Sequence, residues 1–200
     1  MSKKYIITLT AANRVGILAA VTTAMDELGG DVQEVSQTVL QKFFTIILAA
    51  RFPEHREQQV IVDHIRDVCR PYGIEVCLKD PEQETLMDEP ESPTEKYFLT
   101  VTGQDQPGIM RQISSRLAQD EIDITDLYAV SGNAEHSFVM VMELSVSADV
   151  DTLSLQTELE KLGKSIGMSA VLKHESIFAA TNEPHPLRAS LLKSRADIEV

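Results

Sequence analysis

The fold is decided by a stretch that occurs twice, as KYIITLT at residues 4–10 and as KYFLTVT at residues 96–102. The offset is 92 residues (96 − 4), and the same offset places Gly16-Ile17 on Gly108-Ile109. After a slip of two residues, an offset of 94 continues the match to the end of the second copy. A long repeat that returns once indicates two copies of one domain, whereas a solenoid repeats a short unit many times. Function is therefore expected in each copy or between copies.

Each copy has the same predicted order of strands and helices. Strands are indicated by β-branched and aromatic runs, and helices by apolar residues three or four positions apart. In the first copy these patterns predict strands at 5–10, 32–39, 43–52 and 74–79, with helices at 17–28 and from about Glu54 to Arg70. The second copy repeats the pattern between 96 and 173, with a hairpin of strands at 123–130 and 136–146. The order βαββαβ predicts an α+β fold of two ferredoxin-like domains in tandem, each an antiparallel sheet with helices on one face and the other face bare.

The predicted boundaries are a first domain at 1–80, a linker at 81–95, a second domain at 96–178 and a tail at 179–200. The linker is acidic and contains prolines, which is typical of a solvated tether. In the tail, the stretch NEPHP at 182–186 does not readily continue a helix or a strand. We therefore expect the tail to be partly ordered, with a short amphipathic helix possible at 187–192.

Composition excludes several classes of function. The formal net charge of −13 argues against direct binding of nucleic acid, which needs concentrated lysine and arginine. No secretory leader or membrane-spanning apolar run is visible in the sequence. The two cysteines, Cys69 and Cys77, lack the spacing of a metal site, and we interpret them as small buried hydrophobic residues. Since no nucleophile, cofactor or metal motif occurs either, we expect a cytoplasmic protein that is not an enzyme, with no cofactor and no catalytic or metal residues.

Two motifs resemble the ACT domains, small regulatory modules that bind amino acids. The stretch GQDQPGI at 103–109 is similar to the family's Asp-x-Pro-Gly turn, and DITDL at 123–127 is similar to the segment that opens the family's second strand. Residues 35–45 and 174–178 resemble the subgroup of free-standing and tandem ACT proteins, which includes the glycine cleavage system transcriptional repressor. The resemblance covers both copies.

The resemblance implies an amino-acid site between this turn and the second strand of an adjacent ACT unit. The turn glycine precedes a helix N-terminus, where free N–H groups and the helix dipole favour a carboxylate that approaches closely. The candidate ligand-binding residues are Asn13, Arg14, Gly16, Ile17, Asp31 and Val32 in the first copy and Asp105, Gln106, Gly108, Ile109, Asp123 and Ile124 in the second. The alternative is that the glycines only form tight turns.

Two of these side chains have a second interpretation. Asp105 accepts a hydrogen bond from a ligand ammonium group, caps the following helix, or does both. Arg14 either pairs with a ligand carboxylate or is a solvated loop charge. Because the first turn offers a base and the second an acid, the two sites need not share a ligand.

These features predict a non-catalytic regulator that senses a small amino acid and acts through protein contact, with a transcription factor or a metabolic enzyme as partner. By resemblance, transcriptional control of amino-acid metabolism, glycine in particular, is the expected setting. The alternative is a ligand-free regulatory or scaffold subunit of a metabolic enzyme. The apolar runs at 43–48 and 138–142 are too apolar on both faces for solvated strands. They predict pairing of the copies, within one chain or in a homo-oligomer.

Overall fold

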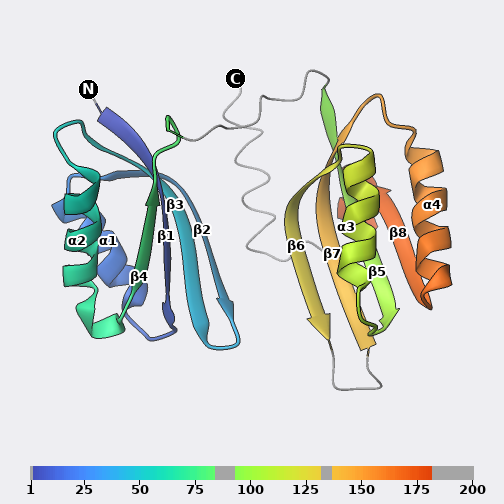
Figure 1. The fold of residues 1–200 in the computed structure, drawn as a ribbon, viewed down its shortest axis with the longest axis horizontal. Helices are drawn as coiled ribbons and strands as arrows, with labels where there is room; N and C mark the ends of the chain where they lie inside the picture. The colour runs from blue at the N-terminus through green and yellow to red at the C-terminus, as the bar shows by residue number, and fades with distance from the viewer. Residues whose placement is uncertain (1, 84–92, 132–136, 182–200) are drawn as a thin grey trace. The chain divides into compact units, whose positions relative to one another are not determined.

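The computed structural model describes residues 2–83, 93–131 and 137–181, which belong to two compact units (Figure 1). One unit ends and the next begins within residues 84–92. Most of the predicted linker and tail therefore lies outside the described residues, as does the tip of the predicted hairpin at 132–136.

The first unit contains a four-stranded antiparallel sheet in the order β2-β3-β1-β4. Its two helices cover one face of the sheet (Figure 1). The elements in chain order are β1 (Ser2–Ala12), α1 (Ile17–Glu27), β2 (Asp31–Leu40), β3 (Phe43–Pro53), α2 (Gln58–Val68), the single 3-10 turn η1 (Arg70–Tyr72) and β4 (Glu75–Lys79).

The second unit repeats this topology, with strands in the order β6-β7-β5-β8. The elements are β5 (Thr94–Gln104), α3 (Ile109–Gln119), β6 (Asp123–Ser131), β7 (Ser137–Ser147), α4 (Thr152–Ser165), β8 (Met168–His174) and the short helix α5 (Glu175–Thr181). The predicted α+β class, with two βαββαβ units in tandem, is confirmed. β5 begins at Thr94, inside the stretch assigned to the linker.

The repeat extends to the backbone angles. Gly16 and Gly108, which precede α1 and α3, both adopt positive φ values, of 94° and 87°. Gly29 has a φ of 70°, and at the matching position of the second unit Glu121 has a φ of 55°. β2 and β6 each carry a bulge two residues after their start. A non-glycine residue in the left-handed region shows that the fold, and not only glycine, imposes this turn.

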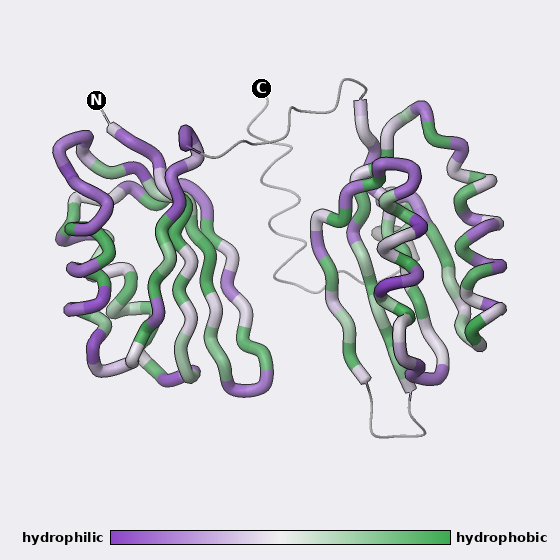
Figure 2. Tube along the Cα trace, in the orientation of Figure 1, coloured by the Kyte–Doolittle hydropathy of each residue, from purple (hydrophilic) through white to green (hydrophobic). Residues whose placement is uncertain are grey.

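Buried and more exposed side chains alternate along the central strands β1 and β5, and the buried ones form part of each core. In β1, Ile7 and Leu9 are fully buried on the helix-covered face, and in β5 Leu99 and Val101 are the equivalents. Apolar stripes on the helices close the two cores, which are separate clusters. Figure 2 shows the hydrophobic residues gathered along the strands. This pattern is the period of two that a sheet with one covered face requires.

Three details differ from the expectations. α2 begins at Gln58, not near Glu54, because a turn, closed by a hydrogen bond from the Arg56 N–H to the Pro53 carbonyl, follows β3. Cys77 is exposed, whereas Cys69 is buried and its burial raises the pKa of its thiol. The open face of the second sheet is not bare, since α5 contacts β5 and β8 and the Phe178 ring stacks on Phe98 with centroids 4.2 Å apart.

Asp80, at the end of the first unit, is a buried carboxylate that forms an ion pair with Lys3. Asp80, which follows β4, is 5% exposed, and its Oδ2 lies 2.7 Å from Lys3 Nζ at the start of β1. Gln58 Nε2 donates to Oδ2, and the Glu82 N–H donates to Oδ1. The hydrogen bond from Lys3 lowers the pKa of Asp80 and raises the pKa of Lys3. The Lys3–Asp80 ion pair thus connects the start of β1 to the residue that follows β4.

We expect Asp80→Asn to lower the melting temperature of the first unit at pH 7. Since the folded-state pKa of Asp80 is lowered, its stabilisation is present above the ordinary aspartate pKa of 3.8 and is lost as the pH falls through the folded-state pKa. The difference in Tm between wild type and Asp80→Asn should therefore shrink below about pH 4. Calorimetry from pH 2.5 to 7 measures it, with Glu82→Gln as the control. A difference that persists at pH 2.5 would contradict the ion pair as its origin.

Candidate functional site

The turn before α1 is closed by residues of its own unit. A methyl group added at Gly16 would lie 2.5 Å from the hydroxyl oxygen of Tyr72, in η1. Arg14 Nη1 donates a hydrogen bond of 3.2 Å to the Pro71 carbonyl, and the Ile17 N–H donates to the Arg14 carbonyl at 3.3 Å. Asn13 is exposed, and its N–H donates to the Lys42 carbonyl. The space that a ligand would need beside Gly16 therefore holds the Tyr72 side chain.

The equivalent turn before α3 is open. Among the residues that the structure describes, a methyl group at Gly108 would meet one atom within 4 Å, Nε2 of the flexible Gln112 side chain at 3.9 Å. No counterpart of the Ile17 hydrogen bond is made by Ile109 within the part of the chain that the structure describes. The helix N-terminus of the second unit can therefore accept an anion, because its N–H groups are unpaired and the glycine leaves the backbone accessible.

Asp105 lies in this open turn and does not cap α3. The N-cap residue is Gly108, which has no side-chain capping bond. The Asp105 carboxylate instead accepts a hydrogen bond of 2.7 Å from the Ser131 hydroxyl at the end of β6. Both side chains are exposed, so Asp105 is oriented by a neighbour and keeps acceptor capacity for a cationic group. Gln106 is exposed beside Gly167.

The candidate residues on the second strands lie at the far end of each unit. Asp123 is opposite Ser145, which is opposite Lys96 near the start of β5. Gly103, at the turn end of β5, is seven residues further on, so the two ends are about 23 Å apart at 3.3 Å per residue. Asp31 has the same place in the first unit. Within one unit, the structure does not bring turn and strand candidates together.

The apolar candidates divide into core and surface. Ile17 and Ile109 are buried in the two cores, and half-buried Ile124 packs against the second core. Val32 is 40% exposed and lines an apolar groove of about 300 Å³ between α1 and β2. Ile17 and Ile109 therefore position the turns from beneath and do not offer a surface to a ligand.

Sequence reasoning missed Tyr72 and Ser131, which decide whether each turn is open and how Asp105 is held. The signal for Tyr72 was available, because the offset of 94 places it opposite Ile166, a residue without a hydroxyl. In the described segments, no group of three His, Cys, Asp or Glu side chains is placed to hold a metal ion. Among the same segments, no helix is long and apolar enough to span a bilayer.

Comparison with known proteins assigns the class. The ACT domain family model matches residues 96–173, the βαββαβ part of the second unit. Among solved structures, an unknown protein from Galdieria sulphuraria aligns over 87% of this chain and 99% of its own, with a TM-score of 0.72 at 17% identity. A candidate glycine cleavage system transcriptional repressor aligns over 87% of this chain and 98% of its own, with a TM-score of 0.61 at 15% identity. The chain is a tandem ACT-domain protein.

Sequence relatives define the family more narrowly. A UPF0237 protein from Methanopyrus kandleri is 37% identical over 85 residues, which are 42% of this chain and 93% of that protein. A UPF0237 protein from Clostridium acetobutylicum is 34% identical over 87 residues, 44% of this chain and 97% of its own length. The chain belongs to the UPF0237 family of ACT-domain regulatory proteins, and these relatives are about as long as one of its two units.

The two turns should respond differently to a methyl group. Alanine at a positive φ costs about 1–2 kcal/mol at either position. We expect Gly16→Ala to cost about 1 kcal/mol more than Gly108→Ala, because its methyl group also meets the Tyr72 hydroxyl. Chemical denaturation of each variant measures the difference. In a Tyr72→Phe background the nearest remaining ring atom lies 3.6 Å away, so the extra cost should vanish. If it persists there, Tyr72 does not close the first turn.

Proposed function

We propose that the protein is a non-catalytic regulator that senses a small amino acid at the Gly108 turn of its second unit. The observation that carries this proposal is the open turn itself, which combines an accessible helix N-terminus with the oriented Asp105 carboxylate. The helix N-terminus suits the ligand carboxylate, and Asp105 suits the ligand ammonium group. A zwitterionic amino acid matches both groups with one small molecule.

The proposal assigns different roles to the two turns. Tyr72 occupies the space beside Gly16, so Asn13 and Arg14 serve the first unit as structural residues. Asp105, Gln106 and Gly108 bind the ligand. The remaining wall comes from the start of a second strand, at Asp31-Val32 or Asp123-Ile124 of a second copy of the chain. The separation of turn and strand start within a unit requires another ACT unit to supply this wall, and we propose that a second copy of the chain in a homo-oligomer supplies it.

The signal is proposed to pass by contact with a protein partner. The second sheet carries exposed apolar side chains on its open face, such as Val139 and Tyr128, and the first carries Phe43 and Ile47. Such surfaces suit burial against another chain. We propose a cytoplasmic setting in the control of amino-acid metabolism, with a DNA-binding protein or a metabolic enzyme as partner. Glycine metabolism is the first setting to test, because the candidate glycine cleavage repressor shares the two-unit fold.

Ligand binding should raise the melting temperature of the full chain. At a hundredfold excess over Kd, binding stabilises by about 2.7 kcal/mol, which is a rise in Tm of at least about 5 °C. We expect one or more of the twenty amino acids to produce this rise. Asp105→Ala should abolish it, whereas the matched control Ser131→Ala keeps the carboxylate, loses the hydrogen bond and should keep most of the rise.

A screen in which no amino acid shifts the Tm of the wild type would contradict the sensor and favour the ligand-free scaffold. Loss of the rise to the same degree in Ser131→Ala would contradict the role of Asp105 as the group that contacts the ligand. A shift retained in Asp105→Ala but lost in Tyr72→Ala would place the ligand in the first unit instead.

A further inference from the structure

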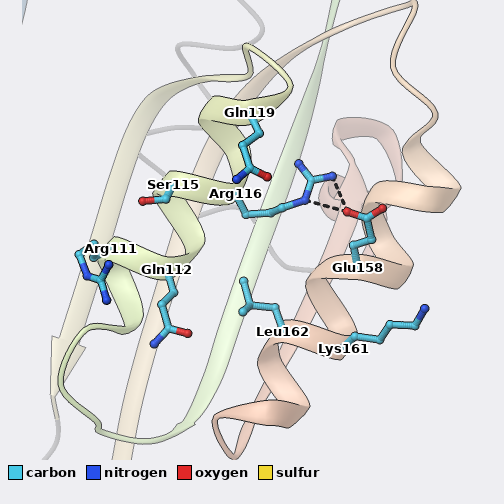
Figure 3. Close-up of a pocket in the computed structure, with 8 residues that line it drawn as sticks. All are labelled: Arg111, Gln112, Ser115, Arg116, Gln119, Glu158, Lys161 and Leu162. Atoms are coloured by element: carbon cyan, nitrogen blue, oxygen red, sulfur yellow. Dashed lines mark hydrogen bonds and ion pairs between the residues drawn. The ribbon is translucent and has the colours of Figure 1, made fainter.

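The helix-covered side of the second unit carries a groove of about 410 Å³ between α3 and α4 (Figure 3). α3 contributes Arg111, Gln112 and Arg116, and α4 contributes Glu158 and Lys161 among its lining residues. Leu162 and the alkyl parts of the long side chains supply apolar surface. The groove is open to solvent along its length, so it suits a segment of chain better than an enclosed small molecule.

In the first unit the helices occupy the same places but lie closer together. α1 and α2 approach each other more closely than α3 and α4 do. The offset of 92 places Ala19 and Ala24 where the second unit has Arg111 and Arg116. Small side chains let two helices approach, whereas a long one between them holds them apart.

Arg116 holds the groove open and is itself paired. Its Nε donates to Glu158 Oε2 at 2.8 Å across the groove, and Nη2 lies 2.6 Å from the same oxygen (Figure 3). Its Nη1 forms an ion pair of 3.0 Å with Asp120. Burial lowers the pKa of Arg116, but these two carboxylates raise it to above its ordinary value. Arg116 is therefore permanently charged, and its ion pair with Glu158 connects α3 to α4.

The groove also concentrates the unpaired cations of its unit. Arg111 and Lys161 are exposed, and neither side chain forms an ion pair or hydrogen bond with any other described residue. Three of the six lysines and arginines in the described part of the second unit line this groove; the six are Lys96, Arg111, Arg116, Lys161, Lys164 and Lys173. At the position of Lys161 the first unit has Asp67.

We propose that the α3–α4 groove is a docking surface for an acidic segment of a partner protein. Arg111 and Lys161 bind carboxylates from opposite walls, and the apolar floor around Leu162 accepts an apolar side chain between them. The rest of the chain is acidic, but charges more than about 8 Å away are largely screened at physiological salt. A protein segment is favoured over nucleic acid, because three cations, one of them already paired, are too few to follow a phosphate backbone. The inference rests on the proposed function, which acts through a protein partner.

The test uses the full chain and a fluorescent peptide of about ten residues in which pairs of glutamates alternate with leucine. We expect the wild type to bind this peptide at least tenfold more tightly than the same peptide with glutamine in place of glutamate. Lys161→Asp, which installs the residue of the first unit, should weaken binding about fivefold. Lys164→Asp makes the same charge change on α4 outside the groove and should change binding less than twofold. Higher salt should weaken the wild-type complex.

The proposal is overturned if the wild type does not distinguish the two peptides, if both aspartate variants weaken binding equally, or if a labelled twelve-nucleotide DNA strand binds more tightly than the peptide. The amino-acid shift in Tm is measured on the same samples. A lost shift with retained peptide binding contradicts the amino-acid sensor and leaves the groove supported. A retained shift without peptide binding overturns the groove alone.

Discussion

The antiparallel pairing of each central strand with both of its neighbours is the constraint on which the rest of the structure depends. β1 lies between β3 and β4, and β5 between β7 and β8. The register places the turn after the central strand at one end of the unit and the start of the next strand in chain order at the other. No side-chain rearrangement can bring these two ends together, because the strand between them is about 23 Å long. A site built from both needs a second ACT unit.

The two units share this sheet topology but differ in how closely their helices pack and in whether the turn glycine is accessible. The first has alanines at the positions of Arg111 and Arg116, a hydrogen bond of 2.8 Å between His64 and Glu27 that joins its two helices, and Tyr72 over its turn. The second has Arg116 between its helices, and among the described residues a methyl group at Gly108 would meet the end of one flexible side chain. Direct packing of small residues stabilises a unit without leaving a surface for partners. In the part of the chain that the structure describes, the second unit retains both an open turn and an open groove, and for this reason our proposals place the ligand and the partner there.

The sequence predicted the fold well, because the repeat and the periods of two and 3.6 report directly on which side chains face the core. It predicted less about the site. The start of α2 was wrong, since a turn after Pro53 delays a helix whose apolar stripe begins at Ile61. The cap role of Asp105 was wrong, because its partner Ser131 is distant in sequence and adjacent only through sheet register. Tyr72 was missed because it too is distant in sequence from the turn that it covers, and its difference from Ile166 in the other copy was not used. Tertiary neighbours of a turn are not encoded in the motif that forms it.

The open turn and the open groove begin on one element. Gly108 immediately precedes α3, and Arg111 lies in the first turn of this helix, about 4.5 Å further along the axis. A ligand carboxylate at the helix N-terminus would therefore lie within a Debye length of a cation that the groove presents to an acidic segment. In this proposal, the ligand carboxylate at the helix N-terminus and the acidic segment draw on the same positive potential, so each weakens it for the other. Linkage then requires the amino acid to lower the affinity for the segment by the factor by which the segment lowers the affinity for the amino acid. In this proposal, the shared first turn of α3 makes partner release depend on the ligand without a change of fold.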